Sequence, residues 1–197
     1  MFALNWKPPW VEKGELYLQY AEVYQDAVKQ LLNGLQEGGH SYKPLPVLFL
    51  LRHYIEIQLT GLVMYGSIFS FKLSEDIDEF LEKNRKDHSL QRVFHKLKEC
   101  EYCLKFPKDF TSFLTNLERF DKASDRFRYP ENRNGTLYFN EDICDKRFFD
   151  IINNPDSLEK YITLIIDNLE GIETYFDIVK EGKEEEYRNN IENNTSA

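Results

Sequence analysis

At 197 residues, the chain is long enough to bury a sizeable apolar core without the support of disulfides or metal ions. Its content of 42% hydrophobic and 15% aromatic residues is typical of a globular protein. The formal net charge of −9 disfavours a surface that coats nucleic acid non-specifically. We therefore expect a single domain over residues 1–182, followed by a polar tail over residues 183–197 that frays.

The sequence favours a cytoplasmic protein. Its N-terminal residues lack the basic start and apolar stretch of a signal peptide, and the longest apolar run, 47–51, is too short to span a bilayer. The odd number of cysteines is typical of reduced thiols. Cys100 and Cys103 with His95 offer three soft ligands, one fewer than a structural zinc site needs. We expect no metal, no cofactor and no membrane contact.

The first half of the chain has helical periodicity. Residues 14–34 form one predicted helix, and a second over 45–70 is apolar on most sides, as in the centre of a helical bundle. A short helix over 75–84 and another that starts near Asp87 follow. The three- and four-residue steps of the first helix are made by Leu16, Tyr20, Val23, Ala27, Leu31 and Leu35.

The second half adds two further helices. One follows Pro107, and a long one covers about 156–181. Between them, residues 124–149 contain Pro130 and an Asn134-Gly135 turn, which predict a loop with at most a short hairpin. The predicted fold is therefore all-α: an up-and-down bundle of five or more helices.

A local excess of positive charge lies between residues 82 and 98. A solvated helix face is the favoured interpretation of this basic stripe, and a nucleic-acid surface is the alternative. Its members are Lys83, Arg85, Lys86, Arg92, Lys96 and Lys98.

The apolar second helix also carries three polar side chains, Arg52, His53 and Glu56. Their spacing of three and four residues places them near one another on the helix surface. Burying an arginine and a glutamate is costly unless they are paired. The group is either a buried ion pair that fixes the helix, or a site in which arginine binds phosphate and histidine transfers protons.

Three segments, taken in order, carry a resemblance to a known family. They are Arg52-His53-Tyr54-Ile55-Glu56-Ile57, then Asp87-His88-Ser89-Leu90, then Phe127-Arg128-Tyr129-Pro130. Together they resemble a branch of the HEPN superfamily of bacterial helical proteins. The resemblance covers residues 45–130. It implies a bundle that commonly dimerises, in a phage-defence or toxin–antitoxin type system.

The resemblance leaves two functions open. One is a metal-independent ribonuclease acting on RNA, with Arg52, His53, Glu56, His88 and Arg128 gathered into a composite catalytic site. The chain lacks the Arg-x4–6-His spacing of the superfamily's active ribonucleases, so these residues would have to come from separate segments. The other function is a non-catalytic module that binds a nucleotide or docks a protein partner. That partner is either a different protein or a second copy of this chain.

Overall fold

The computed structural model describes residues 9–37, 44–66, 71–100, 104–121 and 146–195. These residues form helices joined by short connections and contain no strand, which confirms the all-α prediction. The described helices are α1 (Pro9–Glu37), α2 (Leu45–Gly66), α3 (Phe71–Asp87), α4 (Leu90–Cys100), α5 (Lys108–Phe120), α6 (Lys146–Ile152) and α7 (Pro155–Thr195).

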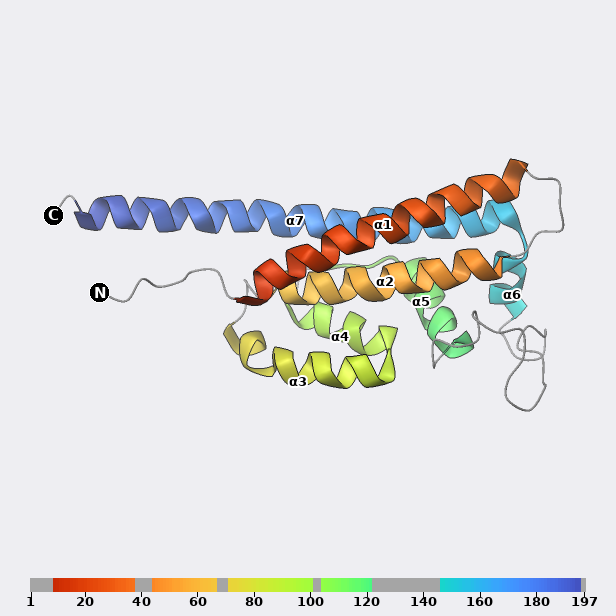
Figure 1. The fold of residues 1–197 in the computed structure, drawn as a ribbon, viewed down its shortest axis with the longest axis horizontal. Coiled ribbons are helices and arrows are strands. Elements are labelled where there is room, and N and C mark those ends of the chain that lie inside the picture. The colour runs from red at the N-terminus through yellow and green to blue at the C-terminus, as the bar shows by residue number, and fades with distance from the viewer. Residues whose placement is uncertain (1–8, 38–43, 67–70, 101–103, 122–145, 196–197) are drawn as a thin grey trace.

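Helix α2 lies at the centre of the bundle, as its sequence predicts. It packs most extensively against α1, and also against α4 and α7, while α1 to α4 run alternately in opposite directions (Figure 1). By length and composition α2 could cross a membrane, but 72% of its most apolar window is buried inside the protein. Its apolar surface is therefore accounted for by the packing of its neighbours.

Two glycines allow α1 and α2 to cross closely. A Cβ atom added to Gly14 would lie 2.8 Å from the backbone nitrogen of Tyr65, and one added to Gly61 would lie 2.9 Å from Leu18. A helix-interior glycine costs about 1 kcal/mol relative to alanine. Here the absence of a side chain lets the two backbones approach, which seats α1 against the central helix.

Four of the six periodic residues that predict α1 are exposed rather than buried. Leu16, Tyr20 and Val23 are each more than 60% exposed, and Leu31 is 40% exposed. A second apolar set, interleaved with the first, is turned to the core: Val11, Leu18, Ala21, Val28 and Leu32. Helix α1 thus has two apolar faces, and the sequence pattern identified the outer one.

The ends of several elements differ from expectation. Helix α6 forms inside the region predicted to be a loop, because Phe148 and Ile152, four residues apart, give it a buried face. The rest of that loop and its predicted hairpin lie outside the described residues. Helix α7 continues past 181 to Thr195, so the segment expected to fray is helical that far, and it projects beyond the bundle (Figure 1).

Candidate functional site

Arg52 is the centre of a buried polar cluster between α2 and the ends of α3 and α5. Its side chain is 1% exposed. Its Nε donates to the Asp121 backbone oxygen at 3.1 Å, Nη2 to the His88 backbone oxygen at 2.8 Å, and Nη1 to Glu56 Oε2 at 3.2 Å. The Asp121 carboxylate also lies 3.2 Å from Nε. We call Arg52, Glu56, His88 and Asp121 the Arg52 cluster.

His88 joins this cluster because of the turn between α3 and α4. It has a φ of 49°, in the left-handed region, and its N–H donates to the Asn84 backbone oxygen at 2.8 Å. That bond is the usual way to end a helix, although glycine or asparagine is the common residue there. The turn directs the His88 carbonyl to Arg52 and brings ring Nδ1 within 2.7 Å of Glu56 Oε1, while 44% of the side chain is exposed.

The start of α4 is fixed by a carboxylate from α5. Ser89 caps the helix, since its Oγ accepts from the Arg92 N–H at 3.2 Å. Glu118 is 9% exposed and accepts from Ser89 Oγ and from the Leu90 N–H, both at 2.8 Å. A negative charge at a helix N-terminus is favourable. Glu118 therefore supports the turn that positions His88.

The structure places four of the five residues of the predicted composite site, and it brings three of them together. Arg52, Glu56 and His88 are in contact. The ring of His53 packs edge-on against Phe49 and against Tyr24 of α1, with centroid distances of 4.6 and 5.8 Å. Arg128 lies outside the described residues.

Sequence reasoning missed Asp121 and Glu118, which complete the site. Glu118 follows Leu114 and Leu117 on the apolar stripe of α5. An acidic residue at a core-facing position is therefore the sequence feature that could have identified it. Asp121 directly follows α5 and is fully buried, but nothing in its sequence context marks it.

A second polar layer joins α7 to α1 and α2, and we call it the α7 seam. It consists of four side-chain contacts: Gln25 with Glu170, Gln58 with Glu173 at 2.6 Å, Tyr65 with Asp177, and Glu15 with Lys180 at 2.6 Å.

Burial and neighbouring negative charges raise the pKa values of groups in and beside this seam. Burial raises the pKa of Glu173; the Gln58 hydrogen bond opposes this, and Asp177, Glu22 and Glu170 raise it further. Burial together with Glu170 and Glu173 also raises the pKa of Tyr54, whose hydroxyl has no hydrogen-bond partner within the described part of the chain. Apart from the Glu15–Lys180 ion pair, the seam is therefore an acidic layer in which Glu170, Glu173 and Asp177 accept from neutral donors.

The chemistry of the Arg52 cluster is limited by its enclosure. Protein oxygens surround the Arg52 guanidinium, so it is not available to a phosphate. His88 is the cluster's accessible proton-transfer group, with Glu56 fixing its ring. Over the residues that the structure describes, no group of three or more His, Cys, Asp or Glu side chains could hold a metal ion.

Acidic neighbours neutralise most of the basic stripe on α3 and α4. Four ion pairs account for this: Lys83 with Glu79, Lys86 with Glu82, Arg92 with Asp87, and Lys96 with Glu99. These contacts favour the solvated helix face over a nucleic-acid surface.

Comparisons with known proteins add no relative from which a role could be carried over: no family model, curated protein or solved structure gives a significant match to the chain.

Proposed function

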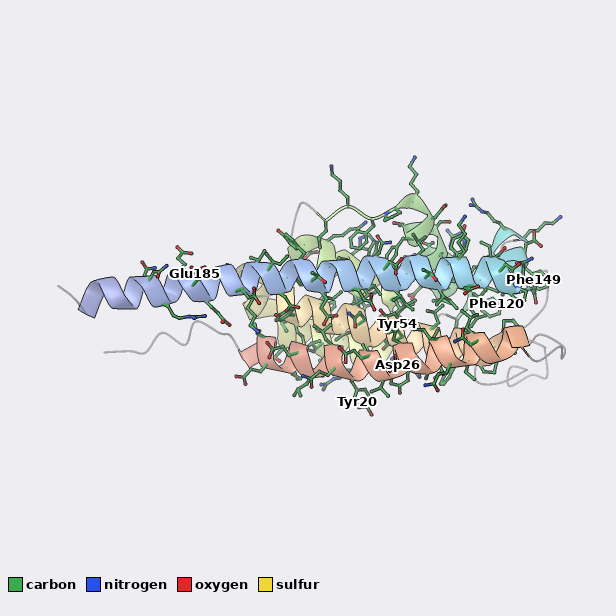
Figure 2. The ribbon with its side chains drawn as sticks, turned by 90° about the horizontal axis from the view of Figure 1, so that it is seen from above. Tyr20, Asp26, Tyr54, Phe120, Phe149 and Glu185 are labelled. Carbon is green, nitrogen blue, oxygen red and sulfur yellow. The ribbon has the colours of Figure 1, made fainter. Side chains whose placement is uncertain are left out.

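We propose that this chain is a non-catalytic, cytoplasmic HEPN-like module of a prokaryotic defence or toxin–antitoxin type system, which acts by docking a protein partner. The observation that carries this proposal is the outer apolar face of α1. Leu16, Tyr20, Val23 and Leu31 form a stripe directly opposite the core-facing side of the helix, and Figure 2 shows Tyr20 projecting away from α7. Contiguous exposed apolar surface of this kind marks interaction sites.

The spacing of the α1 stripe favours a second copy of the chain as the partner. Steps of four, three and four residues from Leu16 to Ala27 are those of a coiled-coil seam. An antiparallel pair with its twofold axis near Val23 places Leu16 opposite Leu31 of the second copy, and Tyr20 opposite Ala27. Tyr20 then faces the small Ala27 while Leu16 faces another leucine, so the apolar stripe is complementary to itself, as a twofold interface requires.

A membrane surface is the less favourable occupant. Helix α1 carries five acids against two lysines, and anionic lipids attract basic rather than acidic helices.

Light scattering tests the docking proposal. We expect the wild-type chain to have about twice its 23.5 kDa mass at micromolar concentration. Val23→Asp should convert it to a monomer, because the substitution places a charge at the centre of the pair. Ile178→Asp is the matched control, since Ile178 on α7 is 63% exposed against 64% for Val23. A wild-type monomer at every concentration, or equal loss of mass in both variants, would refute this interface.

A metal-independent ribonuclease is the second candidate, and the Glu56–His88 contact favours it. A carboxylate that holds one imidazole nitrogen leaves the other free to act as an acid or base. The docking proposal predicts no cleavage of RNA above background. If the purified protein does cleave RNA, and His88→Ala abolishes cleavage while His95→Ala, at an exposed histidine of α4, does not, the ribonuclease replaces the docking module.

A further inference from the structure

The outer face of α5 and the start of α6 line a groove of about 640 Å³. Lys108, Ser112, Thr115 and Arg119 follow one another at steps of four, three and four residues, so they share one face of α5. Arg147 of α6 extends over the same groove. The groove lies apart from both the Arg52 cluster and the α1 stripe.

The cations of this groove are not neutralised as those of α3 and α4 are. Within the described ranges, no carboxylate lies at ion-pair distance from the exposed Lys108 or Arg119. Arg147 lies 3.6 Å from Asp109, but the two side chains are 71% and 60% exposed, so this pair is weak. Counted over the residues that the structure describes, the groove therefore carries a net positive charge on a chain whose total charge is −9.

Neutral groups that suit a nucleoside lie among these cations. The Ser112 hydroxyl and the Asn116 amide line the groove, and both can donate and accept hydrogen bonds. The half-buried Phe106 ring also lines the groove, with the Lys98 ammonium 5.7 Å from its centroid. Aromatic rings beside cations are a common platform for nucleobases.

We propose that this groove binds a nucleotide, either free or as a unit of an RNA strand. Lys108, Arg119 and Arg147 bind the phosphates, Ser112 and Asn116 hydrogen-bond to the sugar or base, and the base contacts Phe106. The volume falls within the range of small-molecule sites. Helical rise separates Lys108 and Arg119 by roughly 16 Å along α5, a span that suits an extended phosphate-bearing ligand.

Fluorescence titration with N-methylanthraniloyl-ATP and with a labelled oligouridylate tests the proposal on the full chain. Arg119→Gln should weaken binding roughly tenfold, which corresponds to the loss of one charge-assisted hydrogen bond. Arg85→Gln is the matched control: it removes one positive charge from an exposed arginine of α3, away from the groove, and should change the affinity less than about twofold. Wild-type affinity should fall as salt rises.

The outcomes separate the sources of the ligand. Tighter binding of ATP than of the oligonucleotide indicates a free nucleotide, and the reverse order indicates RNA; both support the groove. No binding of either probe at low salt, or equal weakening in Arg119→Gln and Arg85→Gln, would overturn the proposal. Full competition by inorganic phosphate at the concentration at which ATP competes would also overturn it, because the base would then contribute nothing.

Discussion

Helix α2 contributes to two polar layers on different faces, and the two layers hold their charges in different ways. The Arg52 cluster places one guanidinium among the carboxylates of Glu56 and Asp121 and two backbone oxygens. The α7 seam instead sets Glu170, Glu173 and Asp177 against amide and hydroxyl donors. The first layer is compensated by opposite charge, and the second leaves negative charges close to one another.

This difference assigns different roles to the two layers. Removing one member of a buried, compensated ion pair leaves its partner without compensation, which is strongly destabilising. Neutralising one acid in a crowded acidic layer relieves repulsion and desolvation. Removing a charge from the Arg52 cluster should therefore destabilise the protein. Removing a negative charge from the α7 seam should instead stabilise it.

Arg52→Met gives the largest expected effect. It keeps much of the side-chain volume but leaves the buried Asp121 and the partly buried Glu56 without their guanidinium partner, so the free energy of unfolding should fall by about 3–5 kcal/mol. Urea unfolding followed by circular dichroism measures the loss. Arg119→Gln, an exposed arginine on α5, should stay within about 0.5 kcal/mol of wild type. A comparable loss in both variants would contradict the compensated-cluster interpretation.

Glu56→Ala should have a smaller effect, because Arg52 keeps Asp121 as a second anionic partner. We expect a loss of about 1–3 kcal/mol, the cost of leaving one charge-assisted donor group less satisfied. The same urea experiment measures it. A loss as large as that of Arg52→Met would show that Asp121 does not share the charge of Arg52, and the cluster would reduce to the single pair Arg52–Glu56.

The sequence predicts the helices and three of the four members of the Arg52 cluster: Arg52 and Glu56 from their helical spacing, and His88 from the resemblance alone. Helical periodicity is local, so the helices themselves can be predicted directly, and Arg52 and Glu56 are one helical turn apart. Their contact with His88 depends on a left-handed residue at the end of α3. The contact with Asp121 depends on the tertiary packing that brings the residue after α5 beside Arg52. Neither is encoded in local spacing.

Helix α1 shows what helical periodicity does not predict, namely which apolar face of a helix is buried. The steps that predict the helix are equally compatible with a buried stripe and with an exposed one. The close packing at Gly14 and Gly61, which is a tertiary feature, accompanies the orientation in which the interleaved set, with Leu18 and Ala21, faces the core.

The smallest expected effect concerns Glu173, and its sign distinguishes the two layers. Burial, aided by Asp177, Glu22 and Glu170, raises the pKa of Glu173 in the folded protein. The folded state then binds this proton more tightly than the unfolded chain, so the ionised carboxylate costs stability above the folded pKa and nothing below the unfolded value of about 4.3. Glu173→Gln keeps an oxygen that accepts from Gln58 and removes the charge.

The Glu173→Gln variant should therefore be more stable than wild type at neutral pH, by roughly 0.5 kcal/mol after allowance for the solvent screening of a half-exposed group. The gain should shrink as the pH falls toward about 4, because wild-type Glu173 is then protonated as well. Glu181→Gln, at an exposed glutamate further along α7, is the matched control and should show no such gain. Thermal unfolding of wild type and both variants, at neutral pH and at about pH 4, measures these stability differences. If Glu173→Gln destabilises the protein at neutral pH, or if its gain does not depend on pH, the α7 seam is a compensated layer like the Arg52 cluster.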